Sequence, residues 1–210
     1  NRGNKFRALR TTNLKEMYIV RYADDFKIFC RKRSDADKIF IATVKWLKKR
    51  LHLDISEEKS RVVNLKRHKS EFLGFEMKLI RKRKTVVVES HMSKKSQQTA
   101  SDKLVKQIKK IQHSSDAKEF GNQVSLYNSM VVGMHNYYKK ATHISVDFPK
   151  INQRIRVVIR NRLNPQSKGK PPNNYIQRYY AKSKQLRWVN NHPLLPVGYV
   201  KHSHTCMPKS

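Results

Sequence analysis

The sequence predicts an α+β protein in which a sheet domain precedes a three-helix bundle and a basic, mostly irregular tail. Apolar residues alternate with polar ones at period two in residues 18–31 and 71–89, a pattern typical of β-hairpins. After residue 90 the apolar spacing changes to that of amphipathic helices. From residue 164 a linker rich in Pro, Asn, Lys and Gly follows. We therefore expect domains at 1–90, 91–164 and 165–210.

The 210 residues carry a large excess of positive charge. Lys and Arg number 47 against 15 Asp and Glu, a formal net charge of +32, and the isoelectric point is about 10.4. Such a surface attracts polyanions, so we expect nucleic acid as the partner and disfavour a small-molecule metabolic enzyme. No apolar stretch of about 18 residues occurs, so we expect no membrane-spanning helix. Two distant cysteines, Cys30 and Cys206, favour a reducing compartment.

The first hairpin is expected to turn at Ala23-Asp24-Asp25 and to be followed by a helix. Ser34 is expected to cap that helix, with Asp37 completing a capping box. Apolar residues at helical spacing then predict an amphipathic helix lying on a sheet. These residues are Ala36, Phe40, Val44, Leu47 and Leu51.

More strands are expected after this helix. Leu53–Leu65 predicts a short strand, a polar turn at Ser56–Lys59 and a second strand from Arg61. Residues 71–89 predict a hairpin that turns at Arg81–Lys84.

Three amphipathic helices are expected between residues 91 and 164, and together they predict a small bundle. Gly133 is expected to permit close helix packing, and Pro165 to follow the end of the third helix. The apolar stripes are Leu104, Val105, Ile108 and Ile111; then Tyr127, Met130, Val131, Met134 and Tyr138; then Ile151, Ile155, Val158, Ile159 and Leu163.

Asp24 and Asp25 carry the clearest chemical signal. They are the only acidic residues between Glu16 and Asp35, at the tip of a predicted hairpin in basic surroundings. Adjacent carboxylates in a tight turn need a counter-charge, and Mg²⁺ takes one or two carboxylates with waters and substrate phosphates. Two such ions support a phosphoryl displacement. The alternative is an ordinary acidic turn, but the flanking apolar strands and the basic surroundings favour metal.

Tyr22-Ala23-Asp24-Asp25 resembles the Y-A-D-D box of reverse transcriptases, and residues 19–26 resemble that box in proteins encoded by group II introns. Four further segments resemble motifs of this family in the expected order. They are 53–59 (the next palm motif), 72–75 (the primer grip), 127–138 (the second thumb helix, the maturase signature) and 181–199 (the segment before a C-terminal HNH nuclease). The resemblance implies the C-terminal part of a palm at 1–90, a thumb at 91–164 and the start of a DNA-binding region in 165–210.

The resemblance also implies roles for single residues. Asp24 would ligate the catalytic Mg²⁺, and Asp25 would support that site and share the ligation. Lys59 would steer or protonate the leaving pyrophosphate, a solvated turn lysine being the alternative. Tyr22 and Ala23 would lie beside the primer terminus and the incoming nucleotide. The primer end would be held by Phe72, Leu73 and Gly74, plain core packing being the alternative.

The chain departs from the family pattern in three places. Such polymerases need a third carboxylate on an upstream palm strand, and no acidic residue precedes Glu16. The fingers motifs and the HNH nuclease are also absent. We therefore expect a carboxy-terminal piece that lacks the fingers and the first half of the palm, and that does not polymerise alone.

Basic side chains on the first and third bundle helices are expected to contact RNA phosphates, a solvated helix face being the alternative. Tail aromatics are expected to stack on unpaired bases, core packing being the alternative. The expected RNA-binding set is Lys103, Lys106, Lys109, Lys110, Arg154, Arg156, Arg160, Arg162, Tyr179, Tyr180, Arg187 and Trp188. His202, His204 and Cys206 carry atoms suited to zinc, but a solvated tail is the favoured interpretation there.

The resemblance implies an RNA-directed DNA polymerase of group II intron type with maturase activity. Its partners would be dNTPs, an RNA template with a DNA primer, structured intron RNA and target DNA. The alternatives are a non-catalytic RNA-binding maturase, which the intact Y-A-D-D box disfavours, and a non-intron bacterial reverse transcriptase, which the thumb-like segment disfavours. The expected location is the bacterial cytoplasm in association with nucleic acid, with an organelle as the alternative.

Overall fold

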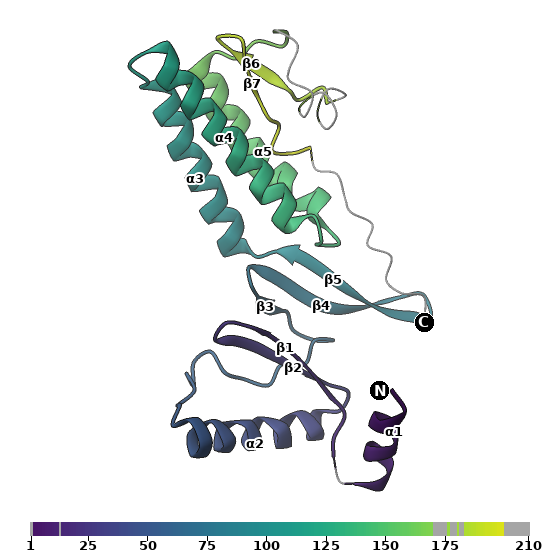
Figure 1. Cartoon of the computed structure of the whole chain (residues 1–210). Coiled ribbons are helices and arrows are strands. Elements are labelled where there is room, and N and C mark those ends of the chain that lie inside the picture. Colours follow the sequence, from purple (N-terminus) through teal and green to yellow (C-terminus); the bar gives the residue numbers. More distant parts are fainter. Residues whose placement is uncertain (1, 13, 170–175, 177–179, 181–182, 200–210) are drawn as a thin grey trace. The chain divides into compact units, whose positions relative to one another are not determined.

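A computed structural model describes residues 2–12, 14–169, 176, 180 and 183–199 (Figure 1). The chain divides into two compact units, Asn1–Phe72 and Leu73–Ser210, which are called unit 1 and unit 2 below. The hairpin of residues 75–92 falls in unit 2 with the helices, whereas the sequence places a boundary near residue 90. None of the described helices is both long and apolar enough to cross a membrane.

Unit 1 begins with a helix that the sequence pattern did not predict, α1 (Arg2–Thr11). An antiparallel hairpin of β1 (Met17–Tyr22) and β2 (Asp25–Cys30) follows, in a register that runs from Met17↔Cys30 to Tyr22↔Asp25. The predicted hairpin is therefore confirmed, and its turn falls on Ala23 and Asp24. Unit 1 ends with the short strand β3 (Ser70–Phe72).

The helix α2 (Arg33–Leu51) packs on β2, which confirms the predicted amphipathic helix on strands. The predicted capping box is wrong, because the N-cap is Lys32, which makes no side-chain capping bond. Asp37 instead accepts hydrogen bonds from Arg33 Nε at 3.0 Å, one turn along the same helix. An ion pair between residues i and i+4 has thus taken the carboxylate that the capping box requires.

The two strands predicted within Leu53–Leu65 are wrong, since residues 52–69 form loops and turns. The predicted polar turn is present, with Ser56 O accepting from the amides of Lys59 and Ser60. A second turn follows in which Asn64 O accepts from the amides of Arg67 and His68. The Asn64 side chain also accepts from the amide of Lys66. These local hydrogen bonds compete with a strand ladder for the same backbone groups.

Unit 2 begins with the hairpin of β4 (Phe75–Lys82) and β5 (Thr85–Met92), paired antiparallel from Phe75↔Met92 to Lys82↔Thr85. This confirms the second predicted hairpin. Three helices follow in the predicted positions: α3 (Lys94–Gln112), α4 (Ala117–Tyr138) and α5 (Ile144–Leu163). Ser93 Oγ accepts from the Ser96 amide and caps α3, and Asp116 caps α4 by accepting from the Glu119 amide.

Helix α3 packs against both α4 and α5 (Figure 1). The buried residues between them are mainly apolar, with the exception of polar side chains such as Gln107, which donates to Gln123 on α4. Leu104, Ile108, Val131 and Ile155 are completely buried, as their helical spacing predicts. Gly133 does not serve close packing, because a Cβ there would meet nothing within 4 Å.

The described part of the tail is mostly irregular in secondary structure, as predicted, but it contains two short strands that the sequence pattern did not indicate. The short strands β6 (Arg187–Val189) and β7 (His192–Leu194) pair with each other, and β7 lies against α4. Asn128 on α4 donates to Pro193 O at 2.8 Å and accepts from the Leu195 amide at 2.9 Å. The tail is held because its apolar side chains complete the core of unit 2. These are Leu186, Val189, Leu194, Leu195 and Val197.

Candidate active site and nucleic-acid interface

The β1–β2 turn places both predicted metal ligands at the tip of the hairpin, exposed to solvent. Ala23 has φ +53°, in the left-handed region, and Arg21 Nε donates to Ala23 O at 2.7 Å, which stabilises the turn. Tyr22 precedes the turn and is 65% exposed. The turn therefore presents Asp24 and Asp25 as neighbouring carboxylates, with an aromatic ring beside them.

Lys27 lies on the same strand as Asp25 and was not singled out by the sequence pattern. Its Nζ donates to Ser70 Oγ at 2.8 Å, which joins β2 to β3. Burial and then the Arg61 guanidinium lower the pKa of Lys27, while the carboxylates of Asp25 and Glu71 act in the opposite direction. A lysine between two apolar residues of a strand is the signal that points to such a half-buried position.

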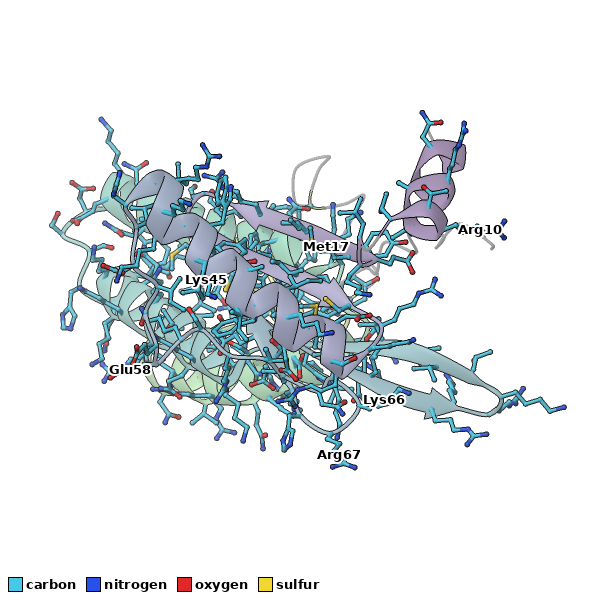
Figure 2. All side chains as sticks on the ribbon, turned by 90° about the horizontal axis from the view of Figure 1, so that it is seen from below. Arg10, Met17, Lys45, Glu58, Lys66 and Arg67 are labelled. Atoms are coloured by element: carbon cyan, nitrogen blue, oxygen red, sulfur yellow. The ribbon has the colours of Figure 1, made fainter. Side chains whose placement is uncertain are left out.

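Unit 1 carries many exposed basic side chains. Figure 2 labels Lys45 on α2, with Lys66 and Arg67 in the following loop, and all three side chains are exposed. Lys59 is exposed in the Ser56–Ser60 turn, which is the position that the sequence predicts. The carboxylate pair thus belongs to a unit whose exposed charges are mainly positive, as phosphate binding requires.

The predicted primer grip spans the division between the two units. Phe72 ends β3 in unit 1, and Leu73 and Gly74 begin unit 2. Leu73 and Gly74 both have positive φ, +50° and +76°, and form a tight turn. Tyr137 Oη donates to Leu73 O, and the Ser93 amide donates to Gly74 O. The turn is therefore fixed to the end of α4 and the start of α3.

Gly74 is required by this turn for two reasons. Its φ lies where side chains are strained. A Cβ would also approach Ser96 Oγ to 2.7 Å and Tyr138 Oη to 2.8 Å. Phe75, the next residue, stacks on Tyr137 and contacts Tyr138, with ring centroids 5.5 and 5.1 Å apart. These two tyrosines thus act in packing, which the sequence also favours.

The eight predicted basic side chains of α3 and α5 are all exposed, on two helices that pack against each other. Two of them bridge the helices: Arg154 pairs with Asp102 at 2.8 Å, and Arg162 donates to Gln112 at 2.7 Å. Exposure of the whole set leaves the solvated-face alternative open, and RNA contact stays a prediction. The set is Lys103, Lys106, Lys109, Lys110, Arg154, Arg156, Arg160 and Arg162.

Tyr180 has no exposed face on which a base could stack, which contradicts its prediction as an RNA contact. It is buried, and its hydroxyl donates to His135 Nδ1 at 3.0 Å. His135 Nε2 donates to Val197 O at 2.8 Å, and this carbonyl fixes the tautomer. Burial lowers the pKa of His135, and the hydrogen bond to Val197 O partly opposes the shift.

The other tail predictions have mixed outcomes. Tyr179 and the residues His202, His204 and Cys206 lie outside the described part of the chain. Trp188 is half-buried against the core, and its backbone pairs with Gln166 in both directions. The Arg187 guanidinium donates to the carbonyls of Lys184 and Leu186, so part of its donor capacity is already used. Base stacking by Trp188 and phosphate binding by Arg187 stay predictions.

Comparison with known families bears on the carboxylate hairpin. Residues 4–77 match the family model of reverse transcriptases (RNA-dependent DNA polymerases). The matched segment begins within α1, contains the Asp24–Asp25 turn, α2 and the Leu73–Gly74 turn, and stops before α3. No curated protein matches the chain. The match supports a reverse-transcriptase-like polymerase domain in this segment and the nucleic acid template and dNTPs that such a domain uses.

The structure also brings together three residues that the sequence pattern did not connect: Glu89, His91 and His143. Glu89 and His91 are two residues apart on β5, so they share one face of the strand. His143 is 52 positions further on, at the N-cap of α5. The Glu-x-His spacing was a local signal, but the third member is visible only in the folded chain.

Proposed function

We propose that the chain is part of an RNA-directed DNA polymerase of group II intron type. The observation that carries the proposal is the exposed Asp24–Asp25 turn at the tip of an antiparallel hairpin, inside the segment that matches the reverse transcriptase family. An ordinary acidic turn would not account for the family match.

The donor set of this turn fits Mg²⁺. Asp24 and Asp25 offer only carboxylate oxygens, which hard divalent cations prefer, and both side chains face solvent where substrate phosphates and waters can complete the coordination. When bound, Mg²⁺ supplies charge stabilisation for attack of a primer 3′-hydroxyl on the α-phosphate of a dNTP. Asp24 is the proposed ligand, and Asp25 supports it.

Other residues of the chain have proposed binding roles. The exposed ring of Tyr22 and the backbone of Ala23 would lie beside the primer terminus and the incoming nucleotide. Lys59 would steer the departing pyrophosphate or give it a proton. Phe72, Leu73 and Gly74 would hold the primer end, and the hydrogen bonds that fix the Leu73–Gly74 turn support a positioning role.

We further propose that additional polypeptide covers unit 1 in the active polymerase. No described residue of unit 1 is buried, and β1 exposes large apolar side chains on both faces of the hairpin. These include Tyr18, Ile19, Val20 and Tyr22. A third carboxylate could reach Asp24 from a strand added at this hairpin.

A second proposed activity is binding of structured intron RNA by unit 2. The exposed cations of α3 and α5 support it, because each phosphate that a cation neutralises releases counterions and adds affinity. The same surface would serve a maturase that stabilises a splicing-competent RNA fold without catalysis.

Primer extension on an RNA template tests the polymerase. The natural gene product that contains these residues is assayed with Mg²⁺ and dNTPs beside its Asp24→Ala and Asp37→Ala variants. Asp37 is a matched control, because it is also an acidic residue of unit 1 but pairs with Arg33 on α2. We expect loss of DNA synthesis with Asp24→Ala alone. Equal synthesis by wild type and Asp24→Ala would refute the assigned site.

RNA affinity tests the second activity. A double substitution of Arg156 and Arg160 by Ala should weaken RNA binding more than Asp24→Ala does. It should also reduce the slope of the logarithm of the affinity against the logarithm of the salt concentration by the equivalent of about two phosphate contacts. Fluorescence anisotropy with labelled intron RNA at several salt concentrations measures both. The opposite ranking, or affinity that does not change with salt, would show that α5 is not a phosphate-binding surface.

A further inference from the structure

The cluster of Glu89, His91 and His143 lies in unit 2 and has no role in the proposed polymerase. Glu89 Oε1 is 3.7 Å from His91 Nε2 and 3.6 Å from His143 Nε2. The two imidazole rings stack with centroids 4.8 Å apart, and one donor atom from each of the three residues lies within 4.8 Å of the others. The side chains of Glu89, His91 and His143 are 25%, 21% and 39% exposed, so solvent reaches the cluster.

Asp147 fixes the tautomer of His91. His91 Nδ1 lies 3.1 and 3.2 Å from the two oxygens of Asp147, whose side chain is only 1% exposed. The carboxylate also accepts from the Met92 amide at 2.9 Å, and Lys150 Nζ approaches it to 3.9 Å. An ionised carboxylate only accepts, so Nδ1 carries the proton and Nε2, 3.7 Å from Glu89 Oε1, keeps a lone pair.

Thr142 holds the imidazole of His143 in place, because its Oγ1 lies 2.9 Å from His143 Nδ1. The same hydroxyl group contacts Ser90, donating to Ser90 O at 3.2 Å and accepting from the Ser90 amide at 2.8 Å. In the tautomer that donates from Nδ1 to Thr142, His143 Nε2 has a lone pair 3.6 Å from Glu89 Oε1.

Three acceptor atoms that face one another require a cation between them. That cation is either a proton on an imidazole or a metal ion. Two imidazole nitrogens and one carboxylate oxygen suit Zn²⁺ and related transition metals better than Mg²⁺. In a tetrahedral zinc site, ligand atoms lie about 3.3–3.5 Å apart for metal–ligand distances of about 2.0–2.1 Å. Both measured separations from Glu89 are within a few tenths of an ångström of that value.

We propose that Glu89, His91 and His143 bind a Zn²⁺-class ion through Oε1 and two Nε2 atoms, with solvent at the fourth position. Asp147 and Thr142 are the outer partners that orient the two imidazoles, an arrangement that raises the basicity of the ligand and holds its ring. Because β5 supplies two ligands and the start of α5 the third, the ion would join the hairpin of unit 2 to its helices. Binding to the native state alone then stabilises unit 2.

Metal titration of the full chain tests this proposal. Metal-free protein at neutral pH is titrated with Zn²⁺ by calorimetry and with Co²⁺ by visible absorption, which reports a tetrahedral site. His143→Ala and Glu89→Gln remove ligands. His113→Ala is the matched control, because His113 is exposed in the same unit and lies outside the cluster. A His202→Ala, His204→Ala, Cys206→Ser variant removes the zinc-type ligands near the C-terminal end of the sequence.

We expect one Zn²⁺ per chain in wild type, His113→Ala and the triple variant, and a rise in the melting temperature of each on adding Zn²⁺. His143→Ala and Glu89→Gln should weaken binding by more than the roughly 10–100-fold that loss of an outer partner costs. Circular dichroism in the presence of chelator checks that both variants fold. If His143→Ala does not fold, Glu89→Gln alone tests the metal site. Absence of binding in wild type, unchanged binding in folded Glu89→Gln, or loss of binding in the triple variant would each overturn the proposal.

Discussion

Tyr127 and Tyr180 are two buried tyrosines of unit 2 whose hydroxyl groups have opposite environments. Tyr127 is 0% exposed, and its hydroxyl has no hydrogen-bond partner among the residues that the structure describes. Burial raises the pKa of this hydroxyl, since its charged form would be unsolvated. The Tyr180 hydroxyl, by contrast, donates to His135 Nδ1. Replacing each tyrosine by Phe should therefore change stability in opposite directions.

The magnitudes follow from these environments. An unsatisfied buried hydroxyl costs about 1–3 kcal/mol. Its removal leaves an atom-sized void of about 20 Å³, which costs about 0.5 kcal/mol at roughly 24 cal/mol per Å³. We therefore expect Tyr127→Phe to stabilise unit 2 by about 1 kcal/mol, a rise of roughly 2–4 °C in melting temperature. Tyr180→Phe leaves His135 Nδ1 unsatisfied and should destabilise unit 2 by about 1–3 kcal/mol.

Urea unfolding followed by tryptophan fluorescence measures both changes. The chain has two tryptophans, Trp46 in unit 1 and Trp188 in unit 2. Trp46 is more than half exposed, so Trp46→Phe gives a background in which Trp188 alone reports unit 2. If Tyr127→Phe destabilised unit 2 by 1 kcal/mol or more, its hydroxyl would have a partner, such as a buried water, and the reasoning would be refuted.

Three further predictions concern unit 2. Gly133→Ala should stabilise α4 by about 0.5–1 kcal/mol in urea unfolding, because a Cβ there meets nothing within 4 Å. Gly121→Ala should raise the free energy of unfolding by less, because the new Cβ would lie 3.3 Å from His192, and an equal increase would contradict the packing argument. Gly74→Ala should destabilise unit 2 by more than about 1 kcal/mol, through a positive φ and overlap with two side chains, and a neutral result in the same assay would contradict the turn geometry. Burial lowers the pKa of His135 in the native state, so on acidification the unfolded chain takes up a proton that the native state does not. The free energy of unfolding is therefore highest above the pKa of the unfolded state, near pH 6.5, and falls below it by at most about 1.4 kcal/mol per pH unit. His135→Gln should reduce this slope between about pH 7 and 5 in the same urea assay.

The sequence predicts elements whose pattern is local and periodic. The β1–β2 hairpin follows from period-two alternation on both sides of Ala23-Asp24, and the three helices of unit 2 follow from their apolar stripes. The two short strands predicted on either side of the Ser56–Lys59 turn are wrong, because short runs of Ile, Val and Leu resemble strands, whereas turn hydrogen bonds at Ser56 and Asn64 take up the backbone groups. The two short tail strands and the burial of the tail are not predicted, because Leu194, Leu195 and Val197 share no single period. Their burial depends on α4, more than 55 positions earlier in the sequence.

The predicted site residues also divide into those that follow from local sequence and those that depend on distant contacts. Asp24 and Asp25 are consecutive, so their proximity follows from the sequence itself. The aromatic, basic tail predicts base stacking for Tyr180, and no local pattern reveals its actual partner His135, which lies 45 positions away. His91 and His143 become neighbours only through the packing of β5 against the start of α5, and no local pattern specifies that contact.

Burial is distributed unevenly between the two units, and this bears on how the proposed polymerase site is stabilised. Unit 2 buries Tyr127, Phe148 and many aliphatic side chains, whereas unit 1 buries none of its described residues. A two-stranded hairpin is marginally stable alone, and burial of one large apolar side chain is worth about 1.5–3 kcal/mol. Covering Ile19 and Val20 of β1 would therefore supply stability that unit 1 does not provide. Since the same hairpin carries Asp24, whatever covers β1 would also fix the carboxylates, and by linkage a cation bound at Asp24 would strengthen the covering contact.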